Sequence, residues 1–219
     1  MGGDNSPDAT LNGAYLASQY LGEKETIVLV GDEKLAKSWF KSNNIDTSVF
    51  EFIHADEVIS MNEHATKALR KKPNNSISVG FNALKNKEID VFSSAGNSGA
   101  MLVGSMFSIG PIKGVIRPSI TSVLPKKNGG VGLILDVGVN ADCKPDVLFQ
   151  FAILGSLFAE NVYNIQKPKV GLLNIGEEKG KGNLLTQSTF QLLEDNDDIN
   201  FVGNVEGRDL FNDKADVIV

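Results

Sequence analysis

The sequence predicts an α/β fold with a largely parallel sheet, and two observations support this prediction. Short runs rich in valine, isoleucine and leucine alternate along the chain with segments of helical periodicity. Turns that contain glycine, asparagine or aspartate separate most of these segments. We find neither an internal repeat nor a low-complexity linker, and we expect a single domain over residues 1–219.

The predicted strands and helices follow one another in a regular order. Strands are expected at residues 26–30, 48–53, 89–93, 120–124, 131–137, 170–175, 199–202 and 216–219. Helices are expected after the Ser6-Pro7-Asp8 cap, after Asp32, and at about residues 63–72, 77–87, 98–109, 145–163, 184–194 and 205–211.

The segment 169–194 is the most informative part of the chain. An apolar run at 170–175 predicts a buried strand, residues 176–183 form a loop rich in glycine and charge, and 184–194 predicts a helix. This order lets backbone N–H groups and a helix N-terminus face an anion, and Lys179 and Lys181 add positive charge there. The loop lacks the Gly-Lys-Ser/Thr of a P-loop and the third glycine of a dinucleotide fingerprint. An ordinary exposed loop, charged for solubility, is the alternative.

Four polar or glycine-rich turns are predicted at the carboxyl ends of strands, where ligands of open α/β sheets bind. They are residues 93–99, 136–145, 174–183 and 203–209. Their glycines permit close backbone approach, and their serine and asparagine side chains can bond an oxyanion. Because the four turns are expected to converge along one sheet edge, they predict an anion site.

Composition and charge exclude several classes of protein. The formal net charge of −6 and the pI near 5.0 argue against a general nucleic-acid binder. A single cysteine, Cys143, excludes an internal disulfide and suits a reducing cytosol. Residues 1–4 are neither basic nor apolar, unlike a signal peptide, and the longest apolar runs are shorter than a membrane span. We therefore expect a cytoplasmic protein.

Both ends of the sequence predict a fragment, or a gene model that lacks both ends. Met1 leads directly into a glycine turn, although a parallel sheet needs chain before the first helix. Val219 stops within an apolar run, with no turn signal after it.

Several blocks of the sequence resemble a known family. They are Met1-Gly2-Gly3-Asp4 with Pro7, and residues 94–100, 136–145, 172–183 and 201–208. In this order they resemble the signature blocks of the PlsX family, bacterial phosphate acyltransferases or acyl-ACP:phosphate transacylases, and the resemblance covers essentially the whole chain. Family members usually have a short strand before the first block. They also continue past the position of Val219 with a glycine-rich segment and helices tied to dimerisation and membrane contact.

The resemblance implies transfer of a fatty acyl group from acyl carrier protein to inorganic phosphate, which gives acyl phosphate for phospholipid synthesis. It implies a Rossmann-like three-layer sandwich, similar to the fold of isopropylmalate dehydrogenases and phosphotransacetylases. It further implies a homodimer for the full-length protein and peripheral membrane association through the missing C-terminal part. We expect no cofactor, no metal and no nucleic acid.

The implied reaction needs groups that hold phosphate beside a thioester and stabilise a tetrahedral oxyanion, and no activated nucleophile is obligatory. The residues expected to act in catalysis are Lys181, Asn183, Asp136, Asn140 and Lys144. Those expected to bind substrate are Gly3, Asp4, Ser94, Gly96, Asn97, Ser98, Gly99, Asn174, Glu177, Asn204, Glu206 and Arg208. Asp136 and Asp142 could orient the lysines or cap turns and helices. Glu177 and Glu178 would both repel phosphate, so at least one is expected to pair with Lys179 or Arg208.

The sequence leaves other interpretations open. Cys143 could carry the acyl group, but only His54 and His64 could activate it, and both are distant in sequence. His54 is more simply a hydrogen-bonded structural residue.

A phosphotransacetylase-like or dehydrogenase-like enzyme of the same fold, or a non-catalytic phosphate-binding module, would share many of these features. The basic clusters 70–72 and 126–127 are candidate docking sites for the acidic carrier protein, or solvated surface.

Overall fold

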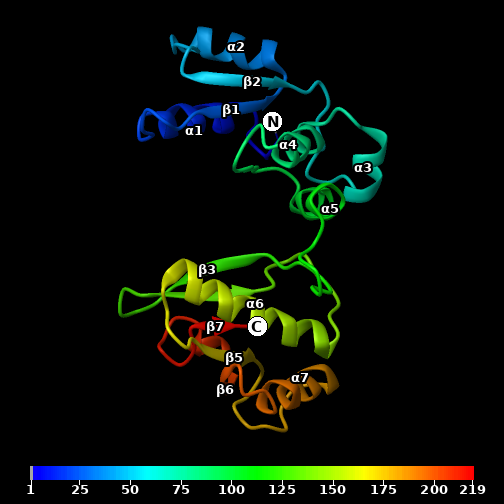
Figure 1. The fold of residues 1–219 in the computed structure, drawn as a ribbon, viewed down its shortest axis with the longest axis vertical. Coiled ribbons are helices and arrows are strands. Elements are labelled where there is room, and N and C mark those ends of the chain that lie inside the picture. The colour runs from blue at the N-terminus through cyan, green and yellow to red at the C-terminus, as the bar shows by residue number, and fades with distance from the viewer. Residues whose placement is uncertain (1) are drawn as a thin grey trace. The chain divides into compact units, whose positions relative to one another are not determined.

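The computed structural model describes residues 2–219, and the chain divides into two compact units, Met1–Pro111 and Ile112–Val219. In Figure 1 the first unit runs from blue to green and the second from green to red. Each unit has its own sheet and its own hydrophobic core. The pairing of strands is mostly parallel, which confirms the predicted α/β class. Among residues 2–219, no helix combines the length and the hydropathy needed to cross a membrane.

The first unit combines a two-stranded parallel sheet with helices. In chain order its elements are α1 (Asp8–Ser18), β1 (Ile27–Gly31), α2 (Glu33–Ser42), β2 (Phe50–His54), α3 (Ala65–Lys71), α4 (Ser76–Lys85) and α5 (Ser98–Ser108). α2 packs against both strands and against α1, and a separate core lies between α3, α4 and α5.

Local sequence explains how α2 and α5 are placed. Asp32 begins α2 as predicted, because its Oδ1 accepts a hydrogen bond from the N–H of Leu35 at 3.1 Å. The buried ring of Phe40 then stacks on Phe50 of β2, with 4.8 Å between the ring centroids. In the second core, a Cβ added at Gly104 would lie 2.9 Å from the Phe81 ring. The close approach of α5 to α4 therefore depends on glycine at this position.

The second unit is a five-stranded sheet with two long helices. In chain order its elements are β3 (Thr121–Pro125), β4 (Val131–Leu135), α6 (Pro145–Tyr163), β5 (Lys169–Leu173), α7 (Leu184–Glu194), β6 (Asn200–Val205), η1 (Gly207–Asp209) and β7 (Val217–Ile218). The strand order is β3-β4-β7-β5-β6, and only β3 is antiparallel to its neighbour. α6 crosses β4, β7 and β5 and also packs against α7 (Figure 1).

Side chains along these strands alternate between the two faces of the sheet, and each face is covered by a hydrophobic core. Leu133, Val170 and Val217 face the core shared with α6 and α7. Val205 and Ile218 belong to a smaller core that the loop between β6 and β7 covers. This alternation has the period of two that a pleated strand imposes.

Most predicted elements are confirmed, and the helices predicted at 145–163 and 184–194 have those bounds in α6 and α7. The strand predicted at 89–93 is wrong. This segment has no ladder partner among the described residues, and Phe92 instead packs edge-on against Phe81, with 5.0 Å between centroids. An apolar run becomes a strand only where a neighbouring strand satisfies its backbone.

The helix predicted at 205–211 is also wrong, since only the short η1 forms there. The strand before it was predicted to end at residue 202, but β6 continues to Val205. The reason lies in its partner, because the Val205 carbonyl accepts a hydrogen bond from the N–H of Asn174 at 2.8 Å. Pairing with β5 therefore extends the strand through two residues predicted as turn and through Val205, which was predicted to begin a helix.

Two helix glycines allow a direct test of this packing. A Cβ at Gly155 of α6 would lie 2.5 Å from Val217 Cγ1 and 2.9 Å from Leu135 Cδ1. Gly155→Ala is therefore expected to lower the free energy of unfolding by about 1–3 kcal/mol. Gly13→Ala in α1, where nothing lies within 4 Å, is expected to raise it by up to about 1 kcal/mol. Urea unfolding followed by circular dichroism measures both, and effects of the same sign would contradict the assigned packing of α6.

Candidate functional site

Parallel pairing places three of the four predicted ligand turns at one edge of the second unit's sheet. β4, β5 and β6 run in the same direction, with β7 between β4 and β5. The turns that follow these strands begin at Asp136, Asn174 and Glu206 and leave the same edge. The remaining predicted turn, at residues 93–99, belongs to the first unit. The candidate site of the second unit is therefore built from three turns.

Two asparagines hold the loop at residues 176–183 from the side of the sheet. Asn204 of β6 is 2% exposed, and its Nδ2 donates to the carbonyl of Glu178 at 3.0 Å. Asn174 donates to the carbonyl of Lys181 at 3.1 Å and to Asn204 Oδ1 at 3.2 Å. Both were predicted to bind substrate, and in the structure their amides fix the path of the loop.

The same loop is held from the side of α7. Gln187 donates from Nε2 to the carbonyls of Gly180 at 2.9 Å and Gly182 at 3.2 Å. Asn183 caps α7 by accepting a hydrogen bond from the N–H of Thr186 at 3.0 Å. Gly182 has φ +85°, and a Cβ there would lie 2.1 Å from Thr186 Oγ1, so only glycine fits.

These hydrogen bonds occupy carbonyl oxygens of the loop and leave its N–H groups available. Within residues 2–219, the N–H groups of residues 176–180, 182 and 183 donate to no protein acceptor. The N-terminus of α7 stands at the end of the same loop. Unpaired N–H groups next to a helix N-terminus favour an anion. The loop therefore offers donors where the sequence predicted an anion site.

The two lysines of the loop differ in how firmly they are paired. Lys179 forms an ion pair with Glu194, and its ammonium lies 5.5 Å from the centroid of the Phe190 ring. The ammonium of Lys181 lies 4.0 Å from the Glu178 carboxylate, and these side chains are 50% and 73% exposed. Both pairs are exposed, but Lys179 is hydrogen-bonded to Glu194 whereas the Lys181–Glu178 distance is too long for a hydrogen bond, so Lys181 is the cation of the loop that is easier to recruit.

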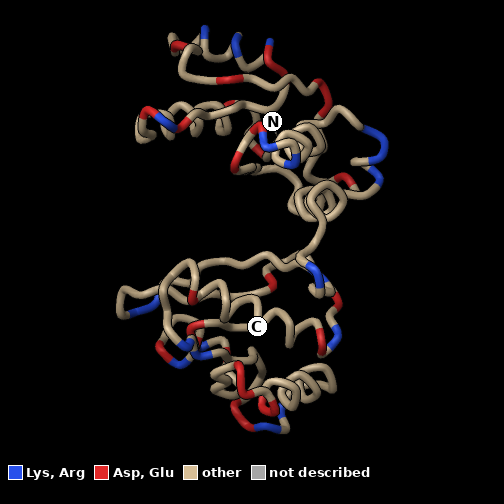
Figure 2. Tube along the Cα trace, in the orientation of Figure 1, with Lys and Arg blue, Asp and Glu red and all other residues tan. Residues whose placement is uncertain are grey.

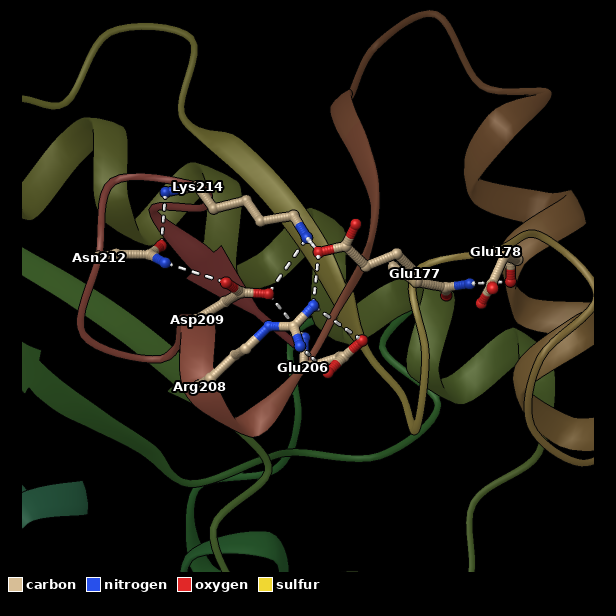
Figure 3. Close-up of polar contacts among 8 residues, drawn as sticks. Glu177, Glu178, Glu206, Arg208, Asp209, Asn212 and Lys214 are labelled. Carbon is tan, nitrogen blue, oxygen red and sulfur yellow. Dashed lines mark hydrogen bonds and ion pairs between the residues drawn. The ribbon is translucent and has the colours of Figure 1, made fainter.

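Glu177 joins a charge network with Arg208 and Lys214, drawn in Figure 3. Its Oε1 accepts from Lys214 at 2.8 Å and from Arg208 at 3.2 Å, while Arg208 also pairs with Glu206 at 3.2 Å. Lys214 and then Arg208 lower the pKa of Glu177, and Glu177 raises the pKa of Arg208. The expected pairing of one loop glutamate with Arg208 is confirmed.

Asp209 anchors this network from inside the protein. It is 6% exposed and accepts from the N–H of Glu206 at 3.0 Å, from Asn212 Nδ2 at 2.9 Å and from Lys214 Nζ at 3.1 Å. The Glu206 N–H contributes most to lowering the pKa of Asp209 to about 2, against the opposing effect of burial. Asp209 therefore stays ionised and fixes the turn that carries Glu206 and Arg208.

Asp136 organises the turn after β4. Its carboxylate accepts from the N–H groups of Ile120 at 2.7 Å, Val139 at 3.0 Å and Asn140 at 2.7 Å. Asn140 donates from Nδ2 to the carbonyl of Pro118 at 2.9 Å. Both predicted catalytic residues thus hold the backbone of the turn, which matches the capping role considered for Asp136.

Cys143 and Lys144 lie at the end of this turn, and their side chains differ in solvent exposure. Lys144 is the N-cap residue of α6, and its exposed side chain has no partner among residues 2–219. Cys143 is partly buried, with its Sγ 4.0 Å from the carbonyl of Asn140. Burial, followed by the Asp136 carboxylate, raises the pKa of the Cys143 thiol. Because the thiolate is the nucleophilic form, this shift disfavours an acyl-enzyme on Cys143.

In the first unit, the predicted blocks at residues 1–4 and 94–100 meet through their backbones. A Cβ added at Gly96 would lie 2.9 Å from Gly2 Cα and 2.9 Å from the Gly3 nitrogen, so neither turn has room for a side chain there. Ser94 Oγ accepts the Gly96 N–H at 3.2 Å. Of the other predicted residues of these blocks, Asp4 is exposed, and Ser98 and Gly99 lie in the first turn of α5.

Asn97 is committed to local structure. It is 6% exposed, has φ +38°, and caps α5 by accepting the N–H of Ala100 at 3.0 Å. Its Nδ2 donates to the carbonyls of Ser60 at 2.9 Å and Glu63 at 3.0 Å. The amide predicted to serve an oxyanion therefore ties the segment at 60–63 to the start of α5.

Sequence reasoning missed three residues that shape the candidate site, namely Gln187, Asp209 and Lys214. Gln187 stands four positions after the Asn183 cap, a spacing that places its side chain next to the loop and could have indicated its role. Asp209 lies within residues 205–211, where a helix was expected, and Lys214 follows that segment. No local pattern indicated that Lys214 would join Asp209 to Glu177.

A model of one protein family, described as fatty acid synthesis protein, matches residues 1–219. The chain belongs to this family. The resemblance to the PlsX family is thereby confirmed. A phosphate acyltransferase of Dictyoglomus thermophilum is 45% identical over 219 residues, and one of Acetivibrio thermocellus is 46% identical over 219 residues. These alignments cover all of this PlsX family chain and 65% and 64% of the two relatives, so the chain spans about two thirds of their length.

Solved structures share the fold of this PlsX family chain. The EutD phosphotransacetylase from Staphylococcus aureus has a TM-score of 0.65 and 17% identity, over 97% of this chain and 74% of that protein. A branched-chain phosphotransacylase from Enterococcus faecalis has a TM-score of 0.65 and 14% identity, over 100% of this chain and 76% of that protein. The predicted likeness to the phosphotransacetylase fold is confirmed.

The low pKa of Asp209 predicts how stability changes with pH. Its folded pKa of about 2 is below the ordinary value of 3.8, so its contribution is present above that value and is lost as the pH falls towards 2. Asp209→Asn is expected to cost about 1–2 kcal/mol near neutral pH, somewhat less than the free energy that corresponds to a pKa shift from 3.8 to about 2.

Urea unfolding of the wild type and of Asp209→Asn between neutral pH and about pH 2 measures this difference. The gap between the two proteins is expected to shrink below the ordinary pKa of aspartate. Asp197→Asn, at an exposed and unpaired position of the described chain, serves as control and should show no such change. A gap that stays constant down to the lowest pH would contradict the assigned ionisation of Asp209.

Proposed function

We propose that the whole protein to which this chain corresponds transfers a fatty acyl group from acyl carrier protein to inorganic phosphate and releases acyl phosphate. Membership of the family and the names of the relatives support a phosphate acyltransferase. The carrier-protein donor and the acyl phosphate product rest on the resemblance of the signature blocks.

The observation that carries the proposal is the loop at residues 176–183. Its carbonyls at 178 and 180–182 are held by amide side chains, whereas seven of its N–H groups have no protein acceptor in the described chain. Lys181 stands beside these donors with only a weak partner. A phosphate dianion needs this combination of N–H donors and a recruitable cation.

The reaction follows from these groups without an activated side chain. A phosphate oxygen attacks the thioester carbonyl carbon, a C–O bond forms, and the C–S bond then breaks. The sulfur leaves as the carrier-protein thiol with the proton that hydrogen phosphate loses. Lys181 and Lys144 are proposed to hold phosphate, and N–H groups at the start of α7 to face the developing negative charge. Asp136, Asn140, Asn174 and Asn204 are proposed to position these turns.

Direct attack by phosphate is preferred to a covalent route through Cys143. The thiol has its pKa raised by burial and by Asp136, and both histidines of the chain lie in the other unit. A cysteine nucleophile needs a neighbouring base or a depressed pKa, and within the described second unit Cys143 has neither.

The further properties that the family resemblance implies are proposed for the whole protein. These are a homodimer, a cytoplasmic location and peripheral membrane association through chain beyond residue 219.

The test mixes the whole protein with phosphate and a long-chain acyl carrier protein and traps acyl phosphate with hydroxylamine. The Acetivibrio thermocellus relative is assayed in parallel as a reference, and acetyl-coenzyme A replaces the donor in a second arm. Hydroxamate from the long-chain donor is expected. Hydroxamate from the acetyl donor alone would favour a phosphotransacetylase. Phosphate binding without any product, while the relative is active, would favour a non-catalytic module.

The two loop lysines are expected to differ in kinetics. Lys181→Met should lower kcat/KM for phosphate by about tenfold to a hundredfold, as one charge-assisted hydrogen bond is lost. A rise in KM alone would indicate ground-state phosphate binding, and a fall in kcat would indicate stabilisation of the oxyanion. Lys179→Met is the matched control and should change kcat/KM by less than about threefold, because Lys179 is paired with Glu194. Equal effects of the two substitutions would remove Lys181 from the site.

A docking face for the acidic carrier protein is proposed on α3. Lys67, Arg70 and Lys71 stand at i, i+3 and i+4, which share one face of a helix. All three are exposed, and none forms an ion pair within residues 2–219. Blue segments of the tube in Figure 2 mark Lys and Arg where Figure 1 labels α3.

The other predicted docking cations are less available. Lys72 pairs with Glu63 at 2.7 Å, and Lys126 is bound to Asp216 at 2.5 Å with only 6% of its side chain exposed. The cluster at 126–127 therefore offers Lys127 alone, whereas α3 offers three cations that need no partner to be displaced.

Charge reversal tests this face. The double variant Arg70→Glu, Lys71→Glu should raise the KM for acyl carrier protein about tenfold and leave the KM for phosphate unchanged, because rim charges act mainly on encounter. Lys127→Glu is the control and should change neither constant by more than about twofold. A larger effect of Lys127→Glu than of the double variant would move the docking face to the β3–β4 hairpin.

A further inference from the structure

A pocket of about 370 Å³ opens in the first unit at the carboxyl end of β1. Its walls come from the turn that precedes α1, the first turn of α2 and the segment that follows β2. The volume is at the lower end of the range for small-molecule sites, and the position is the edge of an α/β sheet where ligands bind. Of the residues expected to bind substrate, Gly3 alone is among those that line this pocket.

Apolar side chains from separate elements gather around the pocket. Leu35 of α2 is 44% exposed, and Val58 and Met61 are 46% and 45% exposed. Ile59 is 3% exposed, and Pro7 completes the apolar lining. Scattered exposed apolar residues need no explanation, but a group that lines one hollow indicates an apolar ligand.

The charges of the pocket argue against an anion. Asp32 is the one ionisable residue among those that line it, and its Oδ1 already accepts the N–H of Leu35 at the start of α2. A carboxylate without a neighbouring cation repels phosphate, and the cap removes a donor that phosphate would use. The lining therefore suits an uncharged chain.

The pocket is joined to the predicted turn at residues 94–99. Asn97 donates to the carbonyl of Ser60 at 2.9 Å, and its N–H lies 2.9 Å from Met61 Sδ. Gly3, which lines the pocket, also packs against Ala95, since a Cβ there would lie 3.4 Å from Ala95. One wall of the pocket is thus fixed to one of the turns expected to contact substrate.

We propose that this pocket binds the fatty acyl chain of the thioester donor. The assignment rests on the proposed acyl transfer, and it adds to that function a specific place for the apolar part of the substrate. The rim residues Leu35, Val58 and Met61 would contact the methylene groups of the chain.

The single tryptophan of the chain gives a binding readout that does not require turnover. Trp39 lies one helical turn after Leu35, and its Nε1 donates to Asp8, the neighbour of Pro7. Bromine quenches indole fluorescence only at short range. The chain is titrated with dibrominated stearate, and unbrominated stearate serves as the blank and as competitor. Saturable quenching that stearate reverses is expected.

Matched substitutions separate the pocket from the rest of the surface. Val58→Asp should weaken the binding of dibrominated stearate about tenfold or more, because it places a carboxylate against the chain. Val49→Asp, at a residue 52% exposed and outside the pocket, should change it by less than about twofold. Leu35→Glu, in the first turn of α2 where an acidic residue is tolerated, should repeat the Val58→Asp result, with circular dichroism to verify folding.

Three outcomes would overturn the assignment. They are absence of saturable quenching, equal affinities of Val58→Asp and Val49→Asp, and displacement of the probe by pantetheine but not by stearate. Turnover is scored separately with long-chain and short-chain donors. Val58→Asp should raise the KM of the long-chain donor and spare that of the short-chain donor. Absence of turnover with every donor would contradict the proposed function, whereas quenching would still decide whether the pocket binds an acyl chain.

Discussion

The hydrogen bond between Asn174 and Asn204 is the contact on which the candidate site of the second unit depends. It joins the end of β5 to β6, and from these two positions the amides hold the carbonyls of Lys181 and Glu178. A loop rich in glycine would otherwise sample many conformations, with its N–H and carbonyl groups equally available to water. Since Asn204 is almost fully buried, its unsatisfied amide would be costly, and this cost keeps the loop closed on the sheet.

Charge pairing decides which side chains of that loop remain for a ligand. The loop has two glutamates and two lysines, so its formal charges cancel. Glu177 is drawn into the network of Arg208 and Lys214, and Lys179 turns to Glu194. What remains beside the unpaired N–H groups is Lys181, with Glu178 as a distant and exposed partner. The local field is therefore more favourable to an anion than either the loop sequence or the net charge of −6 implies.

Close backbone approach is the second constraint of the structure. Gly155 lets α6 lie against Leu135 and Val217, and Gly96 lets the turn before α5 touch the turn before α1. A side chain at either position would separate the elements by the width of a methyl group, and close-packed interiors do not absorb such a change without strain. These glycines stand at contacts between elements, so their importance cannot be recognised from local turn propensity.

The sequence by itself determined the α/β class, the bounds of α6 and α7, the Asp32 cap and the strand-loop-helix order around residues 176–183. These features are local, because helical periodicity, capping and turn residues act within a few positions of the chain. The tertiary structure alone decided that residues 89–93 form no strand, that β6 continues to Val205, and that Gln187, Asp209 and Lys214 shape the site. It also turned Asn97 from an expected donor into a bridge between α5 and residues 60–63. The Gln187 and Asn97 contacts, for example, join residues 7 and 37 positions apart in sequence, and such a hydrogen bond is specified only when the fold brings the partner within reach.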